Sequence, residues 1–374
     1  MPAAEPVTGT ARTNGGPGPA LRQPFLGLLV LVGVVIVSLG LIATLEWPTF
    51  RDSVSYYLVC AVPTLFVVGP FWRGEHPRAL TRLAQPWRGL ALTGLALVVA
   101  AIVAVVVNVV LGEGRTPPSP NVAHIVIMAV PFTFLFAVVW DGWPFRRMGH
   151  QVLAGLALQL AAYLVAVAAY LALASYDSFK AGPAYVAAID PGGPFDAWAL
   201  MTFVVTTMAV ALLLLHLDLW PLAGTPALAG GARRAGALTA VILVVSALAM
   251  WLGTGVGGLD PPTFLVGVAI PFIFGSIVVL NVFEGALPLP AAQPVRGLAS
   301  AVLAAVIGLV LAGLYAVLAT RVSGDVPFGG PGYQGEVWLA SALLAVTFPL
   351  LSVVIDCFGF WPARRAVADA GRDG

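Results

Sequence analysis

Ten long apolar stretches constrain the fold of this 374-residue chain more than any other feature of its sequence. A helix that crosses a bilayer needs roughly 20 mostly apolar residues, and most of the stretches carry no charge over their central turns. Strands of a membrane barrel would alternate in hydrophobicity, whereas the run from Leu95 to Leu111 does not. The sequence therefore predicts an all-α integral membrane protein with helices near 25–46, 54–72, 88–112, 122–143, 150–175, 197–220, 235–256, 262–286, 297–320 and 336–361.

The overall composition excludes several other classes of protein. Hydrophobic residues make up 60% of the chain and charged residues only 9%, whereas soluble domains carry about 25% charged residues. The 18 Lys and Arg residues nearly balance the 17 Asp and Glu residues. These values exclude a soluble enzyme, a disordered chain and a basic nucleic-acid binder. The partner expected first is the lipid bilayer.

The two ends of the chain differ from the apolar part. Residues 1–23 are rich in Pro and Gly and poor in apolar residues, which is typical of a disordered tail. A signal peptide would have an apolar core of 7–15 residues, and the run from Phe25 to Leu45 is longer. We therefore interpret that run as a retained first helix, and residues 364–374 as a second tail.

The distribution of basic residues predicts the orientation. If the chain crosses the membrane ten times, 14 of the 18 Lys and Arg residues fall on the side of the two tails. The positive-inside rule then places both termini in the cytoplasm. The chain has one Lys against 17 Arg and is rich in Ala, Val, Gly and Leu, which is typical of high-GC bacterial genomes. We expect a bacterial plasma membrane protein.

The even-numbered helices end in similar sequences, which predicts an internal repeat. Aromatic and proline residues close these helices, and the closing prolines recur every 67 to 77 residues at Pro70, Pro144, Pro221, Pro288 and Pro362. Odd-numbered helices also open alike, as in Arg88-Gly89-Leu90-Ala91 and Arg296-Gly297-Leu298-Ala299. A repeat of this length predicts helical hairpins. We expect one membrane domain, 24–363, built from five parallel hairpins near 24–73, 88–147, 150–222, 234–288 and 296–363, closed as a ring or open as an arc.

Four of the even-numbered helices also carry an interior proline. A proline frees a backbone carbonyl and kinks a helix, which membranes tolerate where neighbouring groups satisfy the freed carbonyl. We expect kinks, and a role in gating, at Pro63, Pro131, Pro271 and Pro349.

Acidic residues near the predicted cytoplasmic ends of even-numbered helices are the main candidates for function. An exposed acid at a helix C-terminus costs roughly 0.3–1 kcal/mol, so acids that recur at the ends of several helices need an explanation. Local ion pairs and hydration are one explanation, and a cluster on converging helices that binds a cation or proton is the other. The candidate set is Asp141, Asp218, Glu284 and Asp356, with His216 and Asn281 beside them in the sequence.

Known catalytic and metal-binding motifs are absent. The chain has no Walker A, HExxH or GxSxG sequence and no Cys/His metal spacing, so we assign no metal site and no cofactor. The single GxGxxG match, 253–258, ends an apolar helix and is interpreted as a turn. Two long outer loops, 175–197 and 320–335, are candidate docking surfaces for a membrane-complex partner, or simply lead into the next helices.

Three functions remain, and each predicts a different arrangement of cavities and side chains. The leading interpretation is a permease-type transport protein for a small solute or ion, which predicts a polar cavity lined by even-numbered helices. A non-catalytic anchor or assembly subunit predicts a filled core and an exposed apolar patch at the two outer loops. An integral membrane enzyme with a His/carboxylate site is the least favoured, and it predicts three of the named polar side chains around one point.

Overall fold

The computed structural model describes residues 23–180, 185–290 and 292–363. Within these residues ten helices are long and apolar enough to cross a membrane, which confirms the predicted number of spans. The predicted tails lie outside the described residues, apart from Gln23. We number the helices spans 1 to 10: Phe25–Ala43, Trp47–Phe71, Trp87–Leu111, Pro120–Val139, Gln151–Leu173, Ala197–His216, Gly231–Val256, Pro261–Val282, Val295–Ser323 and Gln334–Cys357.

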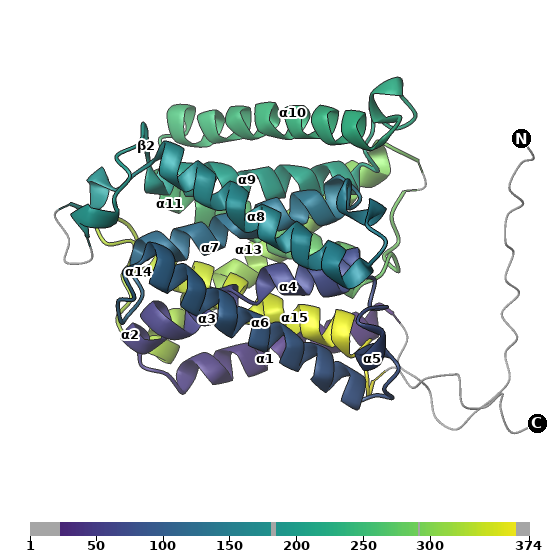
Figure 1. Ribbon diagram of the computed structural model, residues 1–374, viewed down its shortest axis with the longest axis horizontal. Coiled ribbons are helices and arrows are strands. Elements are labelled where there is room, and N and C mark those ends of the chain that lie inside the picture. Colours follow the sequence, from purple (N-terminus) through teal and green to yellow (C-terminus); the bar gives the residue numbers. More distant parts are fainter. Residues whose placement is uncertain (1–22, 181–184, 291, 364–374) are drawn as a thin grey trace, which may run out of the picture.

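The helices run side by side, so their connections gather at two opposite ends of the bundle (Figure 1). One end carries the start of α1 (Phe25–Ala43), the short helix α5 (Arg78–Thr81) and the end of span 10, and we call it the terminal face. The other end carries α2 (Trp47–Thr49) and the two-stranded parallel pairing of β1 (Ala174–Ser175) with β2 (Phe195–Asp196), and we call it the loop face.

Span 2 begins earlier than the sequence predicts. The sequence predicts a start near residue 54, but the span begins at Trp47. Arg51 Nη2 donates to Asp52 Oδ2 at 2.8 Å. Because the two charges pair with each other within the first turns, the helix includes them near the membrane surface.

Odd and even spans differ in regularity. The odd spans are α1 (Phe25–Ala43), α6 (Trp87–Leu111), α8 (Gln151–Leu173), α10 (Gly231–Met250) continued by the π-helical η8 (Trp251–Val256), and α13 (Val295–Ser323).

Four even spans are interrupted by π-helical turns. Span 2 holds α2, η1 (Phe50–Val54), α3 (Ser55–Val59), α4 (Val62–Phe66) and η2 (Val67–Phe71), and span 4 holds α7 (Pro120–Phe134) and η3 (Leu135–Val139). Span 8 holds α11 (Pro261–Phe264), η9 (Leu265–Ala269), α12 (Ile270–Ile277) and η10 (Val278–Val282), and span 10 holds α14 (Gln334–Ala340), η11 (Ser341–Thr347), α15 (Phe348–Ser352) and η12 (Val353–Cys357).

Interior prolines explain part of this irregularity. Pro271 and Pro349 each stand in the first turn of an α-helical segment that directly follows a π-helical one. A proline has no N–H for the carbonyl four residues earlier, and a π-helical turn accommodates the changed pairing. Span 6 has no interior proline and is the single α-helix α9 (Ala197–His216).

Burial alternates between the two kinds of span. In the most apolar stretch of each even span, 61% to 72% of the residues are buried, against 22% to 39% in the odd spans. The hydrophobic core therefore lies among the even spans, and the odd spans form the outer layer. Exposed apolar side chains such as Val105 and Val310 on the odd spans fit contact with lipid.

The even spans close into a ring. In ring order α4 of span 2 packs on α7 of span 4, α7 on α9 of span 6, α9 on α12 of span 8, α12 on η11 of span 10, and η11 on α3 of span 2. An arc would leave the last of these contacts unmade.

Each odd span lies over the seam between two even spans. Span 5 contacts spans 2 and 4, span 9 contacts spans 6 and 8, and span 1 contacts spans 8 and 10. An odd span therefore packs on the even span before it in the chain, and span 1 packs on span 10.

The entry of every odd span follows the same rule around the ring. A glycine among the first five residues of each odd span contacts the end of the even span whose number is three lower. Spans 1 and 3 follow the same rule when the count continues from span 1 back to span 10. The pairs are Gly155 with Trp72, Gly231 with Trp143, Gly297 with His216, Gly27 with Val282, and Gly89 with Phe358.

Candidate functional site

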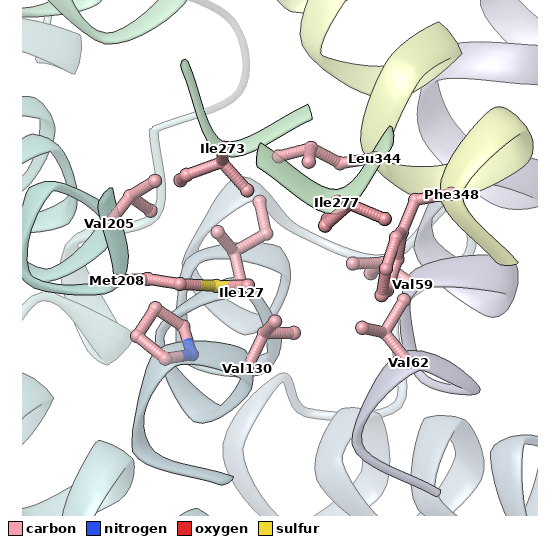
Figure 2. Close-up of a pocket in the computed structure, with 11 residues that line it drawn as sticks. Val59, Val62, Ile127, Val130, Val205, Met208, Ile273, Ile277, Leu344 and Phe348 are labelled. Carbon is pink, nitrogen blue, oxygen red and sulfur yellow. The ribbon is translucent and has the colours of Figure 1, made fainter. Parts of the chain in front are cut away.

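A small cavity lies within the ring of even spans, and all five of these spans line it (Figure 2). Its volume is about 30 Å³. The side chains around it point toward one another from different helices. They are Val59, Val62, Ile127, Val130, Pro131, Val205, Met208, Ile273, Ile277, Leu344 and Phe348.

The cavity wall is apolar. Each lining residue carries a hydrocarbon, thioether or proline side chain, and a cavity that offers no hydrogen-bond partner stays dry. The even spans line a cavity as the transport interpretation predicts, but its wall is apolar, so the predicted polar lining is not found at this cavity.

Three phenylalanines close the terminal side of the cavity. Phe66 and Phe134 follow the lining residues Val62 and Val130 by one helical turn, and the Phe66 ring lies 5.4 Å from the rings of both Phe134 and Phe348. All three side chains are buried. The cluster joins spans 2, 4 and 10, so we call Phe66, Phe134 and Phe348 the aromatic plug.

The candidate acids occupy helix ends with a distinctive backbone. Asp141, Asp218 and Glu284 have φ values of 52°, 50° and 47°, and the residue after each also has positive φ. The same pair of positive-φ residues ends span 2 at Arg73-Gly74 and span 10 at Gly359-Phe360. This left-handed conformation satisfies the last carbonyls of a helix.

Each of these three acids has its own nearby partner. Asp141 forms an ion pair with Arg146 at 3.7 Å. Asp218 accepts hydrogen bonds from Gln293 Nε2, at 2.8 Å, and from Arg296. Glu284 accepts one from Gln23 Nε2 at 3.3 Å. These contacts are local, and none of them joins two of the acids.

Asp356 differs from the other acids. It lies inside η12, three residues before the positive-φ pair at Gly359-Phe360. A Cβ at Gly69 would come within 2.6 Å of its carboxylate, so the glycine makes room for the acid between spans 2 and 10. Asn281 has the matching position in span 8, three residues before Glu284, and its side chain is exposed.

His216 lies deeper than the acids. Its side chain is buried, and Nδ1 lies 2.7 Å from the Ser300 hydroxyl of span 9. Nε2 has no hydrogen-bond partner within the described part of the chain. The same described residues contain no group of three or more His, Cys, Asp or Glu side chains that could hold a metal ion.

Three glutamines form contacts that the sequence reasoning missed. Gln23, Gln85 and Gln293 each precede a proline, and the side-chain oxygen of each accepts the backbone N–H four residues later, at Gly27, Gly89 and Gly297. Their amide nitrogens donate to the carbonyls of Val282, Cys357 and His216, at the ends of spans 8, 10 and 6. We call these residues the glutamine clamps. The pattern Gln-Pro-x-x-Gly, present three times, was the available signal.

The loop face is covered by packed aromatic residues from the long loops. The Tyr176 hydroxyl lies 2.7 Å from His124 Nδ1, and the ring of Trp198, in the first turn of α9, lies 6.3 Å from the ring of the loop residue Tyr333. Burial raises the pKa of Tyr176 well above its ordinary value. Phe195 and Phe328 are the large apolar side chains left exposed in the described parts of these loops, at 53% and 48%.

Comparisons with known proteins identify no relative. The chain matches no protein family, no curated protein and no solved structure at a significant level.

Proposed function

We propose that this chain is a permease-type membrane protein that passes a small uncharged solute along the axis of the ring. The observation that carries the proposal is the convergence of all five even spans on one apolar cavity. The aromatic plug on its terminal side supplies a barrier that a solute must displace. The apolar lining and the separate partners of the acids favour an uncharged solute, so cation or proton coupling through the acids is not part of the proposal.

We also propose that the chain is a parallel five-fold repeat with both termini in a bacterial cytoplasm. The shared glycine contacts, the positive-φ pairs at all five even-span ends and the ring order support the repeat. The many arginines of the terminal face, among them Arg73, Arg146 and Arg233, support the orientation.

Flux into liposomes tests the transport function. We expect liposomes that contain the purified protein to admit urea and glycerol faster than empty liposomes, measured by stopped-flow light scattering, without leaking potassium. Phe66→Ala removes the central ring of the plug, so it should raise solute flux about tenfold, the effect of lowering a barrier by about 1.4 kcal/mol.

Phe25→Ala is the matched control. Phe25 is 69% exposed on span 1, so its truncation should leave solute flux unchanged. Equal flux with the wild type, with Phe66→Ala and with empty liposomes would contradict the transport proposal.

That negative result would favour a membrane assembly subunit. The specific observation behind this second candidate is the exposure of Phe195 and Phe328 on the two long loops. Exposed aromatic residues of this kind are typical of protein contact surfaces.

A further inference from the structure

The middle of span 10 is a short α-helical segment between two π-helical ones. α15 has five residues, with η11 directly before it and η12 directly after it. Leu344 of η11 and Phe348 of α15 both line the cavity (Figure 2), and Leu344 is the one residue of the cavity wall that lies in a π-helical segment. Phe348 also belongs to the aromatic plug. The backbone around α15 therefore determines where one ring of the plug lies.

Hydrogen bonds to other spans fix both ends of span 10. Near the loop face the Trp338 side chain is buried, and its Nε1 donates to Ser323 Oγ of span 9 at 2.8 Å. At the terminal face, Gln85 Nε2 donates to the Cys357 carbonyl at 2.9 Å. A rearrangement in the middle of span 10 is therefore confined to the segments between these two contacts.

The two π-helical segments allow α15 to rotate between the fixed ends. A π-helical turn pairs each N–H with the carbonyl five residues earlier, whereas an α-helix pairs it with the carbonyl four residues earlier. When the pairing shifts from one pattern to the other, the π-helical turn moves along the helix, and the residues that it passes rotate about the helix axis. Pro349 of α15 has no N–H and so has no hydrogen bond to exchange. Rotation of α15 therefore breaks fewer hydrogen bonds than rotation of a regular helix.

Two hydroxyl groups hold η11 in its π-helical form. The Thr347 hydroxyl donates to the Ala342 carbonyl, five residues earlier, at 2.8 Å. In the α-helical parts of other even spans, Thr133 and Thr206 donate to the carbonyl four residues earlier. A threonine hydroxyl has one hydrogen, so the Tyr315 hydroxyl of span 9, which lies 2.7 Å from Thr347 Oγ1, donates to Thr347. The contact with Ala342 therefore matches the π-helical pairing, and span 9 supports it.

We propose that α15 is a rotating gate, which turns Phe348 away from Phe66 and opens one side of the aromatic plug when the π-helical turns shift along span 10. Tyr315 and Thr347 are the positioning residues that hold the closed form, in which the two rings are in contact. The role as a gate rests on the proposed transport function, whereas the rotation itself follows from the contacts of span 10.

Fluorine NMR of the full-length protein in detergent micelles tests the rotation. A single fluorine on the Phe348 ring reports its surroundings, because the Phe66 ring, 5.4 Å away in the closed form, shifts its resonance. Spectra are compared for the wild type and two variants. Tyr315→Phe removes one hydroxyl of the pair, and Thr347→Val removes the other while keeping the shape of the side chain.

We expect a second resonance from Phe348 in both variants. Tyr315→Phe should raise its share relative to the main resonance by about two- to tenfold, the effect of one net hydrogen bond. Thr347→Val removes both hydrogen bonds and should raise the share further. A single resonance, unchanged from the wild type in both variants, would overturn the proposal.

Two controls separate rotation of α15 from a general loosening of the helices. Tyr170→Phe removes another buried hydroxyl of an odd span, which donates to the Ile189 carbonyl near the loop face, and it should leave the Phe348 spectrum unchanged. A fluorine on Phe360, beyond the fixed end of span 10, should keep one resonance in Tyr315→Phe and Thr347→Val. A second resonance in either control would contradict a rotation confined to α15.

Urea flux into liposomes distinguishes the rotation from the transport function. The variants that enrich the second resonance should also raise the flux, because they open the plug more often. A second resonance without an increase in flux would contradict the transport proposal and the role as a gate, but not the rotation of α15.

Discussion

Glycines set the closest helix contact in the structure. Gly275 of α12 and Gly308 of α13 face backbone directly: a Cβ on either would lie 1.8 Å from a carbonyl oxygen, of Ala304 and of Pro271 respectively. Membrane helices approach this closely only through small residues. Spans 8 and 9 therefore depend on the absence of two side chains, and not on any polar pair.

This contact predicts a sharp difference between glycines of one helix. Gly308→Ala should lower the free energy of unfolding by about 1–3 kcal/mol, because the added methyl forces α13 away from α12. Gly313→Ala on the same helix meets no atom within 4 Å and should be neutral or stabilising by up to about 1 kcal/mol. Thermal unfolding in detergent micelles compares them, and equal melting temperatures would contradict the packing described.

The candidate acids also acquire a structural explanation at the residue scale. Asp141, Asp218 and Glu284 have left-handed backbone, which Asp adopts more readily than most residues because its short polar side chain bonds locally. Asp218 and Glu284 also accept hydrogen bonds from clamp glutamines. Left-handed helix termination is thus a structural role that Asp141, Asp218 and Glu284 share, whereas Asp356 lies inside η12.

At the scale of elements, the two kinds of helix have separate tasks. The odd spans are regular and mostly exposed, whereas the even spans are buried and contain most of the π-helical turns. Regular helices suit contact with lipid, because every backbone group is paired within the helix. Irregular backbone is placed where neighbouring helices cover it.

A substitution at Pro131 tests whether the irregular backbone of the even spans contributes to function. Pro131 lies inside α7 and lines the cavity, so Pro131→Ala should restore one hydrogen bond and stabilise the protein by about 1 kcal/mol. If the kink assists gating, the same variant should lower solute flux. Pro120→Ala is the control, because Pro120 stands in the first turn of α7, where no N–H is needed. A less stable Pro131→Ala protein would contradict the assigned cost of the kink.

At the scale of the whole molecule, the ring of helices closes on itself, although the two ends of the chain are not joined to each other. Span 10 packs on span 1 as each other even span packs on its successor. A circular permutant should therefore fold. We expect one that joins residue 374 to residue 1 and opens the chain at Glu75 to melt within a few degrees of the native protein.

Local chemistry determined what could be predicted from the sequence alone. The ten helices follow from apolar length, since a bilayer requires about 20 residues per crossing, and the structure confirms their number. The start of span 2 was predicted near residue 54, whereas the helix begins at Trp47 and includes the paired charges of Arg51 and Asp52. The Gln-Pro-x-x-Gly pattern is visible in the sequence. The contacts of its glutamine could not be predicted, because the carbonyls that it binds lie up to 272 residues away.

Only the tertiary structure decided that the even spans form the inside of a closed ring, that their shared cavity is apolar, and that three of the acids have local partners. Apolar periodicity cannot distinguish a helix face that meets lipid from one that meets protein, since both surroundings are equally apolar. The sequence determined that the chain lies in a membrane and where it crosses. Close packing determined which helices surround the axis.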